Sequence, residues 1–186
     1  MSDDRGRHTL GRRALLGAGA VALLSLALEP RRALAAALEP RRLRLLHTHT
    51  GERLDVTYRE GGAWLPDALA ELDRFLRDFR TGEVRPIDPG VLDVAWSLAR
   101  ATGRPLGTFE IVSGYRSPRT NALLRERTGG VARRSYHLQG RALDLRLEGV
   151  ATEHLRDAAL HLARGGVGFY RESDFVHVDT GPVRRW

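Results

Sequence analysis

Two histidines and an aspartate in the C-terminal part of the chain have the residue types and spacing that suit a metal site. His137 and Asp144 stand seven positions apart, and Gly140 between them permits a tight turn. Leucines flank Asp144 on both sides, so alternation along a strand would point them into a core and the carboxylate away from it. His177 lies between two valines in the same way. Two imidazoles and a carboxylate with an open fourth position are typical of a catalytic zinc ion, which activates water and polarises a carbonyl under attack.

These side chains need a scaffold, and the pattern of apolar residues predicts one. Alternation indicates two strands within 43–58, around a turn at 50–52. Further strands are predicted at 109–112, 141–147 and 175–179, and helices at 66–80, 89–100, 118–127 and 152–164. Helices and strands mix without a regular βαβ alternation. We therefore expect an α+β fold, in which helices pack on a small, mainly antiparallel sheet.

The first 35 residues have the features of an export signal. An uncharged apolar run over 14–28 follows Arg12 and Arg13 and precedes a small-residue cleavage pattern at 33–35. The paired arginines resemble the twin-arginine signal. We predict a signal peptide over 1–35, a linker over 36–42 and a single folded domain over 43–186. An uncut membrane anchor is the alternative, although Glu29 and the residues after it interrupt the apolar run early.

Composition narrows the functional classes. The chain of 186 residues has no cysteine, so a metal must be held by histidine and carboxylate. The net charge is +7, but the arginines after the N-terminal segment are dispersed, without a basic run interleaved with aromatic residues. We therefore expect no nucleic-acid partner, whereas a mildly basic surface suits an anionic cell wall. The sequence leaves the oligomeric state open.

The segment from Ser135 to Asp144 resembles a motif of the zinc peptidases of the M15 family, the D-Ala-D-Ala carboxypeptidase group, whose fold is shared with the hedgehog signalling domain. The matched pattern is Ser-x-His-x-x-Gly-x-Ala-x-Asp, and each fixed position agrees. The segments 113–117 and 166–170, together with 175–184, are similar to one branch in particular, the twin-arginine-exported murein endopeptidases of the MepK type. The resemblance extends over about 43–186.

This resemblance implies roles for individual residues. His137, Asp144 and His177 would bind Zn²⁺, and Arg116 would hold or polarise a substrate carbonyl or carboxylate. Many relatives have a carboxylate three residues before the last zinc histidine, which makes Asp174 the expected general base. Asp179 is the alternative, as the base or as a partner of His177.

The same resemblance implies an activity. We expect a periplasmic or cell-envelope endopeptidase, exported by the twin-arginine machinery, that cuts the L,D (3-3) cross-links between peptidoglycan peptide stems. A D,D-carboxypeptidase or D,D-endopeptidase using the same site is one alternative, and a non-catalytic peptidoglycan-binding module is another. Outside the motif, His47 and His49 could bind metal, but structural or rim positions are favoured, and Trp186 is interpreted as a packing residue.

Overall fold

The computed structural model describes residues 38–128 and 130–186. The chain divides into two compact units, Met1–Glu39 and Pro40–Trp186, and the second contains the fold discussed below. The predicted signal peptide over 1–35 lies outside the described residues, as does the start of the predicted linker over 36–42. The first strand begins at Arg41, two residues before the predicted start of the domain. Within the described part of the chain, no helix is long and apolar enough to cross a membrane.

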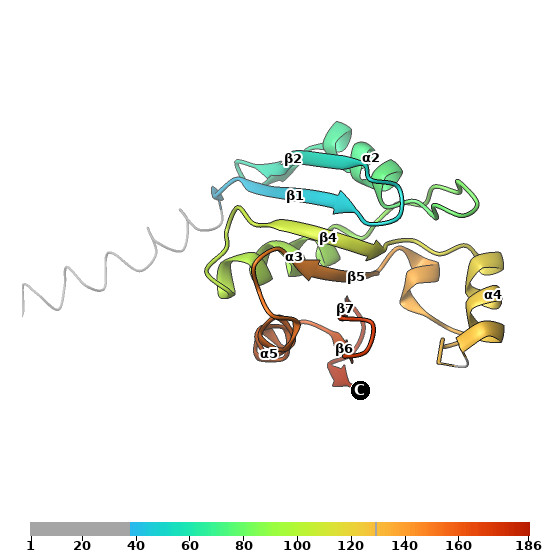
Figure 1. The fold of residues 1–186 in the computed structure, drawn as a ribbon. Helices are drawn as coiled ribbons and strands as arrows, with labels where there is room; N and C mark the ends of the chain where they lie inside the picture. Colours follow the sequence, from blue (N-terminus) through green and yellow to red (C-terminus); the bar gives the residue numbers. More distant parts are fainter. Residues whose placement is uncertain (1–37, 129) are drawn as a thin grey trace, which may run out of the picture. The chain divides into compact units, whose positions relative to one another are not determined.

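One mixed sheet organises this unit (Figure 1). In the described residues it has eight strands, in the order β3-β2-β1-β4-β5-β7-β6-β8. Their bounds are β1 Arg41–His47, β2 Arg53–Glu60, β3 Ala63–Trp64, β4 Thr108–Ser113, β5 Ala142–Leu147, β6 Gly166–Tyr170, β7 Phe175–Asp179 and β8 Arg184–Arg185. The pairs β1–β4 and β6–β8 are parallel and the other pairs are antiparallel, which confirms the predicted α+β class with a mainly antiparallel sheet.

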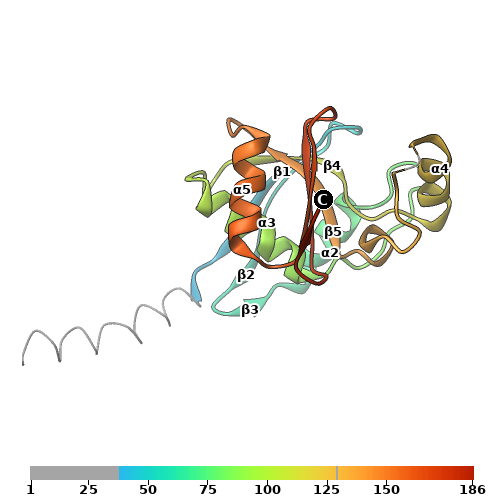
Figure 2. The same ribbon diagram turned by 90° about the horizontal axis from the view of Figure 1, so that it is seen from below.

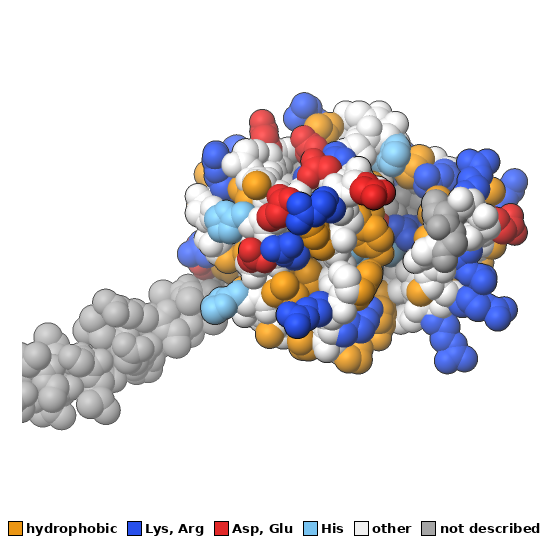
Figure 3. Space-filling model, turned by 60° about the horizontal axis from the view of Figure 1, so that its bottom comes forward, with side chains coloured by type: hydrophobic (Ala, Val, Ile, Leu, Met, Phe, Trp, Pro, Cys, Tyr) orange, Lys and Arg blue, Asp and Glu red, His pale blue; other side chains and the backbone are white. Residues whose placement is uncertain are grey.

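Four α-helices and one 3-10 helix accompany the sheet in the described residues: α2 Pro66–Phe75, α3 Pro89–Ala101, α4 Pro118–Thr128, η1 Tyr136–Gln139 and α5 Thr152–Leu162. Helices α3 and α5 contact each other, and both pack on β5 and β7 (Figure 2). Helix α4 lies beyond the carboxyl end of β4, away from these two helices. Helix α4 has exposed arginines at positions 119, 125 and 127. Blue side chains gather at the end of the molecule where α4 lies (Figure 3).

The core forms where the apolar face of the sheet meets the helices. Leu143 and Leu145 of β5 pair with Val178 and Val176 of β7, and all four side chains are buried. They pack with Leu98 of α3 and with other buried residues of the helices. The alternation predicted for these two strands is therefore confirmed: their apolar side chains enter the core, and Asp144 and His177 point to the opposite face.

The structure also differs from the expected elements: the short strands β3 and β8 and the short helix η1 were not predicted, and two further differences concern longer segments. The helix predicted over 66–80 ends at Phe75, because the chain then turns around the buried carboxylate of Asp78, which accepts hydrogen bonds from Arg80 N and Ser117 N. The strand β6 was not predicted. Its sequence, Gly-Val-Gly-Phe-Tyr, is too rich in glycine to show a clear strand pattern, and it pairs with β7 as a hairpin.

Candidate active site

A row of paired residues crosses the four neighbouring strands β4, β5, β7 and β6, on the face of the sheet opposite helices α3 and α5. Asp144 of β5 lies directly opposite His177 of β7, and His177 lies opposite Gly168 of β6. On the other side, a register shift in β4 after Ile111 brings Ser113 opposite Asp144. Such a bulge re-aims side chains at the end of a strand. The sheet itself therefore aligns the site.

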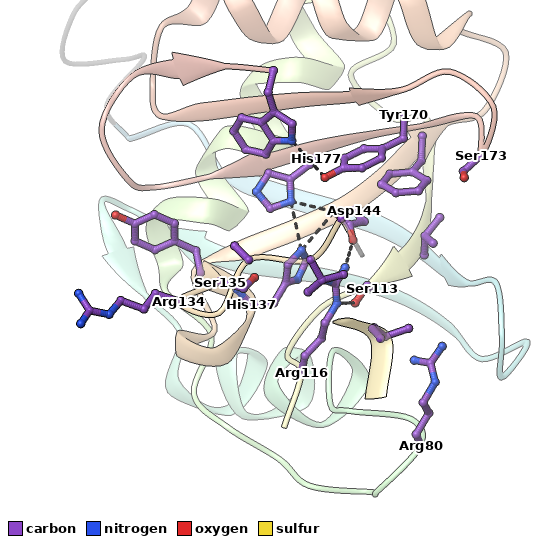
Figure 4. A pocket seen from close by; sticks show the side chains of 18 of the residues that line it. Arg80, Ser113, Arg116, Arg134, Ser135, His137, Asp144, Tyr170, Ser173 and His177 are labelled. Carbon is purple, nitrogen blue, oxygen red and sulfur yellow. Dashed lines mark hydrogen bonds and ion pairs between the residues drawn. The ribbon is translucent and has the colours of Figure 1, made fainter. Parts of the chain in front are cut away.

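Three atoms from this region converge. His137 Nε2 lies 3.1 Å from Asp144 Oδ1 and 3.1 Å from His177 Nδ1, and the last two atoms are 2.8 Å apart (Figure 4). All three side chains are buried. Among the described residues, they are the group of histidine and acidic side chains whose ligand atoms lie close enough together to hold a metal ion. The structure thus brings together the three residues that the sequence predicted as ligands.

His137 reaches the sheet from the short helix η1 rather than from an irregular loop. The hydroxyl of Ser135 accepts a hydrogen bond from His137 N at the start of η1, and Gly140 ends it in the left-handed conformation, with φ of 67°. The ring Nδ1 donates to the carbonyl oxygen of Gly114 at 2.6 Å. Because a carbonyl can only accept, Nε2 carries the lone pair that faces Asp144 and His177.

His177 is oriented by Asp179, two residues later on the same face of β7. Its Nε2 lies 2.9 Å from Asp179 Oδ2 and donates to it, because the carboxylate can only accept, and Nδ1 then faces the cluster. The carboxylate of Asp179 also accepts from Gly166 N at 3.1 Å, from Gly181 N at 2.8 Å and from Arg184. Asp179 is therefore fixed as the partner that sets the ring of His177.

Arg116 lies beside the cluster. Its Nη2 contacts Asp144 Oδ2, and its Nε donates to Ser113 Oγ at 2.9 Å. Asp144 thus presents one oxygen to the two imidazoles and the other to the guanidinium. The side chain of Arg116 is 13% exposed, so one edge of the guanidinium still reaches the pocket. Arg116 was predicted to hold or polarise a substrate group, and the structure places its guanidinium beside the three clustered side chains.

The cluster has an uneven distribution of charge. Burial lowers the pKa of His137 to about 4 and keeps that ring neutral. Burial opposes ionisation of Asp144, but His137 and Arg116 hold the pKa of its carboxyl well below the usual range. Burial also disfavours the charged form of His177, yet hydrogen bonds to Asp144 and Asp179 raise the pKa of its imidazole. The site therefore presents a carboxylate between two imidazoles, the arrangement that favours a cation.

Asp174 is not brought to this cluster. It lies in the turn before β7, with φ of 50°, and its Oδ1 accepts a hydrogen bond from Thr152 Oγ1 at 2.6 Å. Its other oxygen lies 3.6 Å from Arg146 Nε, and the side chain is 66% exposed. β7 does begin at Phe175, but the left-handed turn directs Asp174 toward α5. Its neighbours Ser173 and Phe175 line the pocket, whereas Asp174 does not.

The cluster lies in a pocket of about 480 Å³. Trp186 lines one wall of the pocket, although the sequence indicated only a packing role. Its indole lies against Gly168, where a Cβ atom would come within 2.6 Å of the ring, and 5.2 Å from the ring of His177. The indole nitrogen donates to Tyr170 Oη at 3.1 Å. This residue was missed as part of the site because nothing in the local sequence links position 186 to β6.

Comparisons with known proteins identify relatives of this chain. The family model described as peptidoglycan L,D-endopeptidase MepK matches residues 35–186. The peptidoglycan L,D-endopeptidase MepK of Escherichia coli (strain K12) is 43% identical over 178 residues, covering 94% of this chain and 96% of that protein. The probable peptidoglycan L,D-endopeptidase MepK of Haemophilus influenzae is 40% identical over 148 residues, covering 80% of each. A crystal structure of the L-Ala D-Glu endopeptidase ChiX of Serratia marcescens is 19% identical, covers 52% of this chain and 69% of that one, and has a TM-score of 0.35.

The family model matches a range that contains the whole folded unit Pro40–Trp186 and each residue of the cluster, and the match to the Escherichia coli relative covers 94% of the chain. The chain belongs to the MepK branch of the M15 peptidases, and it is a peptidase.

Proposed function

We propose that this chain is a zinc-dependent murein endopeptidase and that it hydrolyses the L,D (3-3) cross-link between two diaminopimelate residues of peptidoglycan. The observation that carries the proposal is the convergence of His137 Nε2, Asp144 Oδ1 and His177 Nδ1 at a pocket, in a chain of the MepK family. The name of the family members supplies the class of bond.

The donor set fits zinc. Ligand atoms bound to tetrahedral zinc at about 2.0–2.1 Å are roughly 3.3 Å apart. The three separations in the cluster are 3.1, 3.1 and 2.8 Å, so only small movements would be needed. Each imidazole also donates its other N–H to an oxygen, His137 to Gly114 and His177 to Asp179, which is the usual support of a metal-binding histidine. When bound, zinc would supply Lewis acidity for activating water and polarising a carbonyl.

Three residues around the cluster would stabilise charge, orient a metal-binding ring and position the peptide. The guanidinium of Arg116, held by Ser113 and Asp144, would stabilise the negative charge that develops on the carbonyl oxygen of the scissile amide. Asp179 would keep the ring of His177 in place. The indole of Trp186 would form a wall against which the peptide lies.

A single assay tests the activity. The purified chain, loaded with zinc or treated with a chelator, is incubated with defined 3-3 and 4-3 cross-linked muropeptides, and the products are identified by mass. We expect the zinc-loaded chain to cut the 3-3 dimer into monomers and the chelated chain to leave it intact. Cleavage of the 4-3 dimer alone, or release of a terminal residue alone, would replace the proposal by a D,D-activity, and binding without cleavage would replace it by a binding module.

A matched pair of variants tests the metal site within the same assay. His177→Ala removes a ligand, and we expect its activity to fall by roughly a thousandfold, because the metal contributes several kcal/mol to the transition state. His154→Ala changes an exposed histidine of α5 and serves as the control. Zinc content is measured for both variants by mass spectrometry. Full activity of His177→Ala would refute the metal mechanism.

We also propose that the protein acts in the periplasm. A murein endopeptidase needs access to the cell wall, and the paired arginines at 12 and 13 support export by the twin-arginine route to the periplasm. A fusion of residues 1–40 to a reporter tests this. We expect export to stop when both arginines are replaced by lysine, and continued export through that route would contradict the assignment.

A further inference from the structure

The pocket next to the metal cluster carries more positive than negative side chains. Of the described residues that line it, four are arginines, at positions 80, 116, 134 and 184, and one is an acid, Asp144. Asp144 contacts Arg116, and Arg184 pairs with Asp179 behind the wall. Among the described residues, no carboxylate lies within ion-pair distance of Arg80 or Arg134. The pocket therefore has cationic groups that its own acids do not neutralise.

Arg80 is held in place by a stack of rings. Its guanidinium carbon lies 4.2 Å from the centroid of the Phe79 ring. The ring of His49 is stacked on the same Phe79, with centroids 4.3 Å apart and an interplanar angle of 15°. His47, which is buried, contacts Phe79 edge-on at 5.3 Å. These contacts hold the guanidinium of Arg80 against the ring of Phe79, and the Arg80 side chain lines the pocket.

The backbone of Arg80 is tied to the segment that carries Arg116. The buried carboxylate of Asp78 accepts from Arg80 N at 2.9 Å through one oxygen and from Ser117 N at 2.8 Å through the other. Ser117 directly follows Arg116. One carboxylate thus fixes the relative position of two arginines, of which Arg116 lies beside the cluster and Arg80 further from it (Figure 4).

The surroundings of Arg80 leave its charge incompletely compensated. Partial burial lowers the pKa of its guanidinium, and Arg116 and Arg127 nearby act in the same direction against the opposing effect of Asp78. An arginine nevertheless stays charged at neutral pH. The attraction of a bound anion would offset both the cost of partly burying the Arg80 guanidinium and its repulsion by Arg116 and Arg127. The planar fork of a guanidinium matches a carboxylate, which it binds through two parallel hydrogen bonds.

We propose that Arg80 forms a carboxylate-binding subsite of the pocket, which recognises a free carboxylate of a peptide stem next to the scissile bond. The assignment rests on the proposed endopeptidase function. Diaminopimelate is a diacid, and each of the two residues in a 3-3 cross-link keeps a free carboxylate at its side-chain end. Arg116 acts at the reacting carbonyl, whereas Arg80 acts on a charge that takes no part in the reaction. Amidation of that carboxylate would remove the recognised group.

The test combines two substrates with three variants of the full chain. The substrates are a 3-3 cross-linked muropeptide dimer with free side-chain carboxylates and the same dimer with both of them amidated. Arg80→Gln removes the charge, and Arg80→Lys keeps a charge without the planar fork. Arg85→Gln is the matched control, since Arg85 is an exposed arginine of the same α2–α3 connection that does not line the pocket.

On the free acid, we expect Arg80→Gln to raise KM about tenfold at unchanged kcat, in keeping with the loss of one charge-assisted interaction. Arg80→Lys should recover part of that loss, and Arg85→Gln should behave as the wild type. Amidation should raise the KM of the wild type by a similar factor and leave Arg80→Gln unaffected. Zinc content and melting temperature should not change in any variant.

Three results would refute the proposed subsite. The first is that Arg80→Gln has the wild-type KM on the free-acid dimer. The second is that Arg80→Gln raises KM equally on the free and amidated dimers, and the third is that it lowers kcat without raising KM. Failure of the proposed function itself looks different, because the wild type then cuts neither dimer. In that case, calorimetry of the two dimers with the wild type and Arg80→Gln still tests the subsite. Equal affinity of the wild type for the free and amidated dimers would refute it.

Discussion

Asp144 and His177 are direct partners in the neighbouring strands β5 and β7, with His177 Nδ1 2.8 Å from Asp144 Oδ1. The residues before and after each of them are buried in the core. The pair is therefore positioned by the same packing that stabilises the sheet. His137 is the one member of this three-residue cluster that comes from outside the sheet, and it is held by Gly114 and Ser135.

The Asp179→Asn variant tests how far metal binding depends on the support of His177. Asparagine lacks the negative charge that holds the ring N–H and can present its amide nitrogen to His177 or to the backbone donors. We expect metal affinity to fall about 10- to 100-fold and stability to fall by about 2 kcal/mol. Affinity is measured by competition with a chromophoric chelator, and Asp157→Asn, at an exposed position on α5, is the control. Unchanged affinity would show that the ring is held by packing alone.

Arg116→Lys separates charge from geometry at the reacting carbonyl. Lysine keeps the charge but cannot contact Ser113 and Asp144 at the same time through a planar fork. We expect kcat on the 3-3 dimer to fall about 100-fold while the zinc content stays the same. Arg119→Lys, on the exposed face of α4, controls for the loss of an arginine. A variant with normal kcat would remove Arg116 from the catalytic step.

Asp174→Asn decides the role of the residue that the sequence predicts as general base. In the structure, the carboxylate of Asp174 accepts from Thr152 and lies outside the pocket lining. We therefore expect activity within about threefold of the wild type and a loss of stability of about 1 kcal/mol. Loss of a general base would instead lower kcat by roughly 10²- to 10⁴-fold. A loss of that size, in a variant with normal zinc content, would establish the base role.

Asp78 should give the fold a measurable dependence on pH. Burial works against ionisation of its carboxyl, but hydrogen bonds from Thr120, Ser117 and Arg80 lower its pKa in the folded state. The unfolded chain therefore takes up the proton first, and the stabilisation is present above about pH 4 and lost as the pH falls through the folded-state pKa. At pH 7, we expect Asp78→Asn to be less stable by about 2 kcal/mol.

The difference between the wild type and Asp78→Asn should then shrink at pH 3. Urea unfolding at both pH values measures it, and the comparison between the two chains cancels the contributions of other titrating groups. A difference that stays constant between pH 7 and pH 3 would mean that Asp78 acts through shape and not through its charge.

Much of the site can be predicted from the sequence because short-range patterns indicate which way its side chains point. Alternation along β5 and β7 identifies the faces of Asp144 and His177, and Gly140 marks the turn after His137. The helix predicted over 89–100 is also present, and Asp88 caps its start by accepting a hydrogen bond from Gly90 N at 2.8 Å. Each of these features depends on residues only a few positions apart, so the sequence alone is sufficient to find them.

Contacts between distant residues were decided only by the tertiary structure. The separation of Asp144 and His177 depends on strand register, which the sequence does not encode in any single segment. The turn at Asp174 directs that carboxylate to Thr152, 22 positions earlier, and the hairpin of β6 and β7 with β8 brings Trp186 to the pocket. Local spacing determines which side chains share a face of a strand, whereas packing of the whole unit determines which of those side chains meet.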